Sequence, residues 1–246
     1  MCDPVESSDS AGLTEVSFWF DFLSPYSWLA CDRASEFARE HGVRWRYRPV
    51  VFGAILDATE LVGPGEVLAK RDGMLRDVQI HAADRGLRFV GPPEHPFRSL
   101  EVLRTACFWQ DRDEVAVVCR ALFAAIWEQG LDLASGGCVD RIEAVLVAAG
   151  IEVPRPVGEL VQDPEIKLRL RQNTEEAIAQ GVYGVPSFRA VAAGAELFWG
   201  QDRMKFLARS LRAGGLPPVD AALDAMCARP IARGRGRAPS GSETKS

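Results

Sequence analysis

The chain has 246 residues, 47% of them hydrophobic, which allows one sizeable core or one domain with a large insertion. Its formal net charge of −5 argues against nucleic acid as a partner. No apolar run approaches the roughly 20 residues that a membrane span needs. Six cysteines without a C-x-x-C pair argue against a disulfide framework, and three histidines without ligand spacing argue against a metal site.

The first periodic segment, residues 16–22, alternates apolar residues at period two and predicts a buried strand. Residues 25–41 carry an apolar stripe at helical spacing and are followed by Gly42, which predicts a helix that ends there. Residues 43–49 alternate again, with arginines on the second face. A strand, a helix and a strand joined by short links predict a βαβ unit with parallel strands.

A helical pattern then extends from about residue 50 to 150. A later helix opens at Pro164 and closes at Gly181, a hairpin follows with its turn at Ala193-Gly194, and a last helix runs from near Asp202 to Gly214. This order predicts an α/β protein with a thioredoxin-like fold and a large all-helical insertion after the second strand. The helices expected in the insertion are 66–85, 99–109, 112–129 and 139–149.

Composition divides the chain further. The segment 229–246 has five basic residues and one acidic residue among glycine, proline and serine, so we expect disorder there. Residues 1–14 lack the pattern of a signal peptide, which predicts a cytoplasmic protein. The expected parts are a disordered segment 1–14, a thioredoxin-like domain 15–50 plus 155–215, an inserted helical domain 51–154, and a largely disordered basic extension 216–246.

The motif Ser24-Pro25-Tyr26-Ser27 stands where the first strand gives way to the helix. One interpretation is structural, because serine is a favoured N-cap and proline a favoured first helical residue. The other is chemical: thioredoxin-like folds carry Cys-Pro-x-Cys at this place, with a thiolate held by the helix N-terminus. With serine at both positions, thiol–disulfide exchange is impossible. A hydroxyl beside a positive helix end is suited to an anion supplied from outside.

A serine-hydrolase role for Ser24 has little support. The flanking residues form no G-x-S-x-G elbow. His41 lies at the far end of the same predicted helix, about 25 Å away at ~1.5 Å per residue. His81 and His95 fall in the insertion, where the sequence does not place them relative to Ser24.

Two further motifs occur near the C-terminal end of the predicted domain. Val185-Pro186 enters a strand where thioredoxin-like folds keep a cis-proline, so we expect a cis bond that leaves the Val185 backbone free to pair with a peptide. Gly200, Gln201 and Asp202 meet the start of the last helix. Asp202 is a natural N-cap, and an amide beside a carboxylate also suits an amino-acid head group; the sequence leaves both roles open.

Together "DFLSPYSWLA", "GVYGVPSF" and "FWGQDRM" resemble the 2-hydroxychromene-2-carboxylate isomerase family, which is similar to kappa-class glutathione transferases within the DsbA-like thioredoxin group. The resemblance spans residues 16–214. It implies glutathione as cofactor, with its sulfur at Ser24, its cysteinyl backbone on Val185 and its γ-glutamyl end at Gly200, Gln201 and Asp202. It also implies a homodimer, a hydrophobic or aromatic small-molecule substrate, and catalysis in which Ser24 stabilises a thiolate that adds reversibly to an unsaturated intermediate of aromatic degradation.

The inserted segment departs from the family pattern. Where the family tends to carry a lysine and an asparagine for substrate, the nearest equivalents are Asp57 and Arg98, and Arg98 is a candidate for binding a substrate carboxylate. The alternatives to the isomerase are a kappa-like transferase or peroxidase acting on another electrophile, and a catalytically silent thioredoxin-like binding module.

Overall fold

The computed structural model describes residues 12–191, 195–215 and 221–229. The predicted order of elements is confirmed. The strands are β1 (Thr14–Phe20), β2 (Val43–Pro49), β3 (Ser187–Ala190) and β4 (Phe198–Trp199), and the helices up to residue 213 are α1 (Pro25–His41), α2 (Phe52–Thr59), α3 (Leu68–Asp84), α4 (Leu100–Trp109), α5 (Val115–Trp127), α6 (Cys138–Ala148), α7 (Val157–Leu160), α8 (Pro164–Ala179), the 3₁₀ turn η1 (Gln201–Arg203) and α9 (Met204–Ala213).

One mixed sheet has the strand order β2-β1-β3-β4. β1 and β2 are parallel, as the βαβ prediction required, and β3 is antiparallel to both β1 and β4. The hairpin predicted at the end of the domain is therefore confirmed in its strands. Its predicted turn at Ala193-Gly194 lies outside the described residues.

Helix α1 begins and ends where its sequence predicted. Ser24 is the N-cap and its side chain accepts a hydrogen bond from Ser27 N, while Gly42 ends the helix with φ 62°. A left-handed residue at that point strongly favours glycine, because a Cβ would be strained there.

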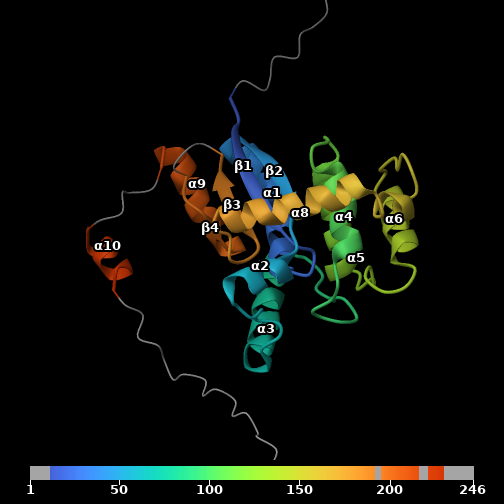
Figure 1. Ribbon diagram of the computed structural model, residues 1–246, viewed down its shortest axis with the longest axis horizontal. Helices are drawn as coiled ribbons and strands as arrows, with labels where there is room; N and C mark the ends of the chain where they lie inside the picture. Colours follow the sequence, from blue (N-terminus) through green and yellow to red (C-terminus); the bar gives the residue numbers. More distant parts are fainter. Residues whose placement is uncertain (1–11, 192–194, 216–220, 230–246) are drawn as a thin grey trace, which may run out of the picture. The chain divides into compact units, whose positions relative to one another are not determined.

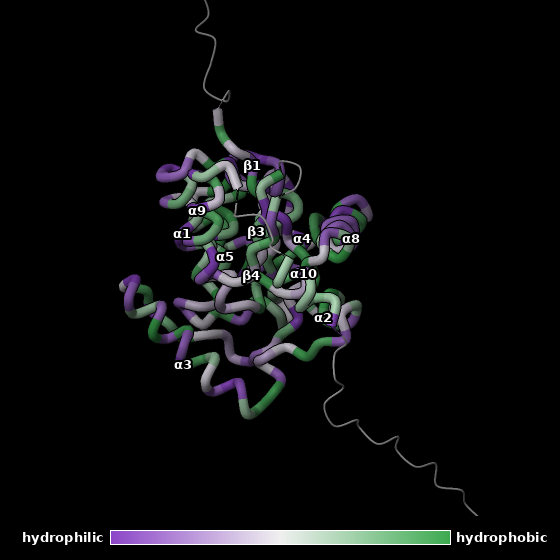
Figure 2. The backbone as a smooth tube through the Cα atoms, turned by 90° about the vertical axis from the view of Figure 1, so that its left-hand side faces the viewer, coloured by the Kyte–Doolittle hydropathy of each residue, from purple (hydrophilic) through white to green (hydrophobic). Residues whose placement is uncertain are grey.

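Helices cover both faces of the sheet. Figure 2 shows α1 and α9 on one side of the strands and α8 on the other. Strand alternation sends the rings of Phe18 and Phe20 toward the α1 side, where Phe18 stacks on Phe188 with ring centroids 5.1 Å apart. Trp19 points to the opposite face and joins a smaller apolar cluster with Val50 and Ala177. Burying both faces explains why β1 is nearly continuous in apolar residues.

The inserted helices α3 to α6 match the predicted segments within a few residues at each end. Two short helices were missed: α2, which follows β2 almost at once, and α7. Both are shorter than the window over which helical periodicity can be recognised. The expected division into domains stays a prediction, and the disorder expected at both ends falls mostly on residues outside those described.

Residues beyond Gly215 form a second unit by themselves. Its described part is the short helix α10 (Ala221–Cys227), all of whose residues are exposed. Within the described ranges, no helix has both the length and the apolar character needed to span a membrane.

Candidate active site

Ser24 lies at the junction between β1 and α1 and is 6% exposed. Its hydroxyl oxygen accepts from Ser27 N at 3.2 Å, so the capping role is confirmed. The first turn of α1 contains no acidic side chain, and Pro25 has no N–H to offer. The Tyr26 N–H has no hydrogen-bond partner in the part of the chain that the structure describes. The positive end of the helix is therefore only partly compensated beside Ser24.

The cis bond predicted at Val185-Pro186 is confirmed. It brings the Val185 carbonyl to the Ser24 hydroxyl, which donates to it at 3.3 Å across 161 residues of sequence. The Val185 N–H has no hydrogen-bond partner among the residues the structure covers. Gly184 is required here, because a Cβ at this position would lie 2.3 Å from Trp199 Nε1. The backbone at Val185 is thus available to an extended ligand, as the motif predicted.

Gly200, Gln201 and Asp202 line the same cavity as Ser24 and Val185. Gly200 has φ 103°, and a Cβ there would meet Asp202 Oδ1 at 2.7 Å. The expected N-cap role of Asp202 is wrong: no side chain caps η1 or α9, whose N-cap positions are Gly200 and Arg203. The carboxylate of Asp202 lies 3.6 Å from Arg203 Nε, and 57% of its side chain is exposed, so a ligand can still reach it.

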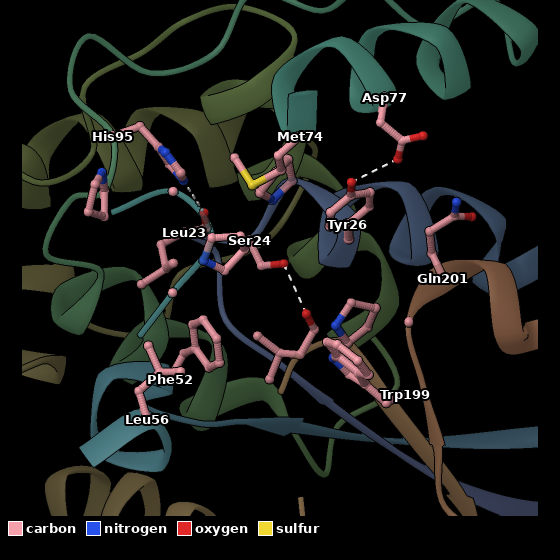
Figure 3. A pocket seen from close by; sticks show the side chains of 18 of the residues that line it. Leu23, Ser24, Tyr26, Phe52, Leu56, Met74, Asp77, His95, Trp199 and Gln201 are labelled. Atoms are coloured by element: carbon pink, nitrogen blue, oxygen red, sulfur yellow. Dashed lines mark hydrogen bonds between the residues drawn. The ribbon is translucent and has the colours of Figure 1, made fainter. Parts of the chain in front are cut away.

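These groups form one wall of a cavity of about 630 Å³. In Figure 3, Ser24 lies between Trp199 and Gln201 on one side and His95, Phe52 and Leu56 on the other. We call the first side the core wall: Ser24, Val185, Gly200, Gln201 and Asp202. The second comes from the inserted helices and is mostly apolar. We call it the insertion wall: Phe52, Leu56, Met74, His95 and Pro96.

Helix α3 is attached to the start of α1 through Tyr26. Its hydroxyl donates to Asp77 Oδ2 at 2.7 Å, and His81 Nε2 lies 3.7 Å from Asp77 Oδ1. Burial, followed by the bond to Asp77, raises the pKa of Tyr26, so the phenol stays protonated. All three side chains line the cavity, and the sequence did not indicate that they would meet.

Both backbone polar groups of Leu23, the residue before Ser24, are hydrogen-bonded. Its N–H donates to Asp21 Oδ1 at 3.1 Å, and its carbonyl accepts from His95 Nε2 at 3.0 Å. Burial lowers the pKa of His95, which keeps the ring neutral near pH 7. Because a carbonyl only accepts, this bond requires the proton on Nε2.

Asp21 joins three segments of the chain. Besides Leu23, it accepts from Ser99 Oγ at 2.6 Å and from Phe52 N at 3.0 Å. These donors belong to the starts of α4 and α2. Complete burial raises the pKa of Asp21 to about 6, although each hydrogen bond opposes the rise. The sequence did not predict that Asp21 and His95 would hold the backbone before Ser24. The one available signal was for Asp21, a charged residue directly after a buried strand.

The structure does not bring Asp57 or Arg98 to the cavity. Both are exposed and neither is among its lining residues. Arg98 instead pairs with Glu101 at 3.4 Å, one turn along α4. The expectation that they bind substrate therefore stays a prediction without support from the geometry.

Of the cysteines that the structure describes, four are buried and one, Cys227, is exposed. Cys31, Cys107, Cys119 and Cys138 are free and buried, and burial raises the pKa of Cys31 and Cys107 to about 12. Such thiols are not reactive nucleophiles. Among residues 12–191, 195–215 and 221–229, no group of three or more His, Cys, Asp or Glu side chains is arranged to hold a metal ion.

A family model described as a DSBA-like thioredoxin domain matches residues 15–212. The chain belongs to this family. It is 29% identical over 198 residues to 2-hydroxychromene-2-carboxylate isomerase from Pseudomonas putida, covering 78% of this chain and 91% of the relative. It is 24% identical over 220 residues to human glutathione S-transferase kappa 1, covering 85% of this chain and 96% of that protein.

Solved structures agree with this assignment to the DsbA-like family. A 2-hydroxychromene-2-carboxylate isomerase superposes with a TM-score of 0.69 at 25% identity, over 81% of this chain and 95% of that one. A probable DsbA oxidoreductase from Streptomyces coelicolor gives a TM-score of 0.66 at 17% identity, over 84% and 93%, and shows the fold alone. The family and the thioredoxin-like fold expected from the motifs are therefore confirmed.

Proposed function

We propose that this protein is a glutathione-dependent isomerase of the 2-hydroxychromene-2-carboxylate isomerase type, acting in the cytoplasm as a homodimer. One observation carries the proposal: the Ser24 hydroxyl, the backbone of a cis Val185-Pro186 unit and the Gly200-to-Asp202 turn converge on one wall of a cavity of about 630 Å³. Hydroxyl, peptide backbone and carboxylate match in order the thiol, the cysteinyl peptide and the γ-glutamyl ammonium of glutathione. The relatives named as glutathione transferases support the same cosubstrate.

Ser24 acts on the bound sulfur as a hydrogen-bond donor. Its bond to Val185 O is long at 3.3 Å, so turning the hydroxyl toward a thiolate sacrifices little. The unpartnered Tyr26 N–H and the only partly compensated end of α1 add positive potential. Together they lower the pKa of a glutathione thiol from its ordinary value of about 8.5. The protein, which has no cysteine here, takes its nucleophile from the cosubstrate.

The reaction then needs no redox partner. The thiolate adds to an electron-poor carbon of an unsaturated substrate, the double bond becomes single and rotates, and elimination of the thiolate restores the double bond in the other geometry. Atoms balance because glutathione leaves unchanged. The hydrogen bond from Ser24 is strongest while the sulfur carries a full negative charge, which is before addition and after elimination. The insertion wall supplies apolar contacts for an aromatic substrate.

The charges of the cavity favour a second candidate, a kappa-like transferase acting on an uncharged electrophile. The described residues that line it include three side chains able to carry positive charge, and each has a partner. His81 lies beside Asp77, His95 donates to Leu23 O, and Arg203 lies beside Asp202. With Arg98 outside the cavity, Arg203 is the one arginine among the described lining residues, and Asp202 competes with a substrate carboxylate for it. In a transferase the thioether bond forms, a leaving group departs or a proton is taken up, and glutathione stays attached.

Two measurements separate these functions. Calorimetric titration with glutathione tests for the cosubstrate site, and we expect saturable binding; no binding overturns both enzymes and leaves a silent binding module. Product analysis then uses 2-hydroxychromene-2-carboxylate and an uncharged activated chloroaromatic compound in the presence of glutathione. Isomerised substrate with glutathione recovered unchanged supports the isomerase, whereas a glutathione conjugate of the second compound without isomerisation of the first supports the transferase.

A further inference from the structure

A second hollow lies on the face of the sheet that α8 covers, and it shares no lining residue with the cavity at Ser24. Figure 1 shows α8 crossing the strands there. The strand register builds its floor, because Ser17 of β1 pairs with Arg46 of β2 on one side and with Arg189 of β3 on the other. Arg48 follows two residues after Arg46 on the same face. We call this the arginine hollow: Ser17, Arg46, Arg48 and Arg189, around a volume of about 570 Å³.

Positive charge in the arginine hollow is only partly balanced. Among the residues that the structure describes, Glu176 of α8 is the single acidic residue that lines it, and Glu176 accepts from Gln180 Nε2 at 2.9 Å. Arg46 lies 3.4 Å from Glu15 and Arg48 lies 3.4 Å from Asp111, but neither carboxylate lines the hollow.

Arg189 is the exception among these arginines. It has no ion-pair partner within the described part of the chain, and its Nε is buried without a hydrogen-bond acceptor. A buried N–H without a hydrogen-bond partner destabilises the fold, and Arg189 and Arg46 flank Ser17 on the two neighbouring strands. An anion bound beside Arg189 would supply both the missing acceptor and the missing ion-pair partner.

The neighbouring part of the same face is built differently. Trp19, two residues along β1 from Ser17, is fully buried and packs in an apolar cluster with Ala177 and Val182. Apolar contact with α8 is therefore available to this face of the sheet. At Ser17, by contrast, the same face carries a hydroxyl between two arginines, and α8 leaves a space there that is large enough for a small molecule.

We propose that the arginine hollow binds the phosphate or carboxylate group of a small polar metabolite, held by Arg189 and Arg46 on either side of the Ser17 hydroxyl. The planar fork of a guanidinium donates two parallel hydrogen bonds to such oxyanions, and the hydroxyl supplies a third donor from the floor. Arg48 lies one step further along β2 and adds attraction. The remaining volume takes the rest of the ligand, facing the polar side chains of Glu176 and Gln180.

The test is calorimetric titration of the full chain at fixed ionic strength with inorganic phosphate, glycerol phosphate and malonate. We expect saturable binding of at least one probe, with the two phosphates and the dicarboxylate distinguishing a phosphoryl from a carboxyl ligand. Arg189→Gln should weaken that binding at least 10-fold. The matched control is Arg44→Gln, which removes an exposed arginine from the same strand without touching the hollow and should leave the affinity unchanged.

Two results overturn the proposal. One is the absence of saturable binding of all three probes to the wild type, and the other is equal weakening by Arg44→Gln and Arg189→Gln, which indicates general charge attraction. If Arg189→Gln does not fold, Ser17→Ala is measured instead, and it should weaken binding several-fold. Glutathione titration of the same samples reports on the other cavity, so failure here and failure of the proposed enzymatic function are seen separately.

Discussion

The two walls of the cavity at Ser24 come from different parts of the chain and differ in chemistry. The core wall presents a hydroxyl, free backbone groups, an amide and a carboxylate, whereas the insertion wall presents mainly aromatic and aliphatic side chains. A polar wall with fixed backbone geometry suits a ligand that is always the same, such as a peptide-like cosubstrate. An apolar wall discriminates by shape, and it can be altered without disturbing the other.

Besides a shared apolar core, in which Phe22 contacts Phe123 and Trp28 contacts Trp127, polar side chains join the two walls. Asp21 ties the loop before Ser24 to the starts of α2 and α4, and Tyr26 ties α1 to α3. The insertion thereby determines where Ser24 stands although it contributes no atom to the core wall. We call these contacts of Asp21 and Tyr26 the joint. Substitutions in the core wall, the insertion wall and the joint should therefore have three different effects on kinetics and stability.

The largest effect is expected on the core wall. Ser24→Ala should lower kcat near pH 7 at least about 100-fold, because losing the donor raises the pKa of the bound glutathione thiol and leaves less of it as the reactive thiolate. It should lower the free energy of unfolding by only about 1 kcal/mol, the value of a lost cap. Steady-state kinetics and urea unfolding measure the two quantities. A Ser24→Ala protein with unchanged kcat would reduce Ser24 to a cap.

Ser27→Ala is the matched control for that substitution. The Ser27 hydroxyl is buried, has no hydrogen-bond partner among the described residues and does not line the cavity. Removing it should leave kcat within about twofold, since the bond to Ser24 uses the Ser27 backbone N–H, which alanine retains.

We expect Asp21 of the joint to make the free energy of unfolding depend on pH. The pKa of Asp21 is raised from its ordinary value of 3.8 to about 6. A raised pKa in the folded state means that stability is complete below about pH 4 and is lost as pH rises through about 6, by up to about 3 kcal/mol. Urea unfolding at several pH values should show this fall in the wild type and not in Asp21→Asn. Equal pH slopes in the two proteins would contradict it.

At the far end of the core wall, Asp202→Asn should raise the KM for glutathione by roughly 10- to 150-fold and leave kcat nearly unchanged. The expected partner of Asp202 is an ammonium group remote from the sulfur, so the contact is equally strong in the ground and transition states. Because Asp202 caps no helix, the melting temperature should not move. Asp57→Asn is the control, and a similar rise in KM there would implicate Asp57 instead.

The smallest effect is expected on the insertion wall. Phe52→Ala should raise the KM for an apolar acceptor about 10-fold through lost contact area, with the KM for glutathione unchanged. The Phe52 N–H keeps its bond to Asp21, so the joint survives the substitution. Arg98→Ala serves as the control and should change neither constant for an uncharged acceptor. A change in the glutathione KM on Phe52→Ala would show that the walls are not separate.

Much of the core wall could be predicted from short stretches of sequence, because local chemistry decides those features. Ser-Pro starts a helix and Gly42 ends it through backbone preferences that act within a few residues. Alternation at period two and short links produced the βαβ unit in the same way. The cis bond at Val185 was expected from the order of elements around it.

The fold decided the rest, since it depends on contacts between segments distant in sequence. His95 meets Leu23 across 72 residues, Ser99 meets Asp21 across 78, and Tyr26 meets Asp77 across 51. Arg98, expected near substrate, does not line the cavity; it precedes α4, is exposed and pairs with Glu101. The sequence by itself determined which groups could stabilise a thiolate at the end of α1. Only the packing of the insertion on the sheet decided what faces them, because no local preference fixes how two distant segments meet.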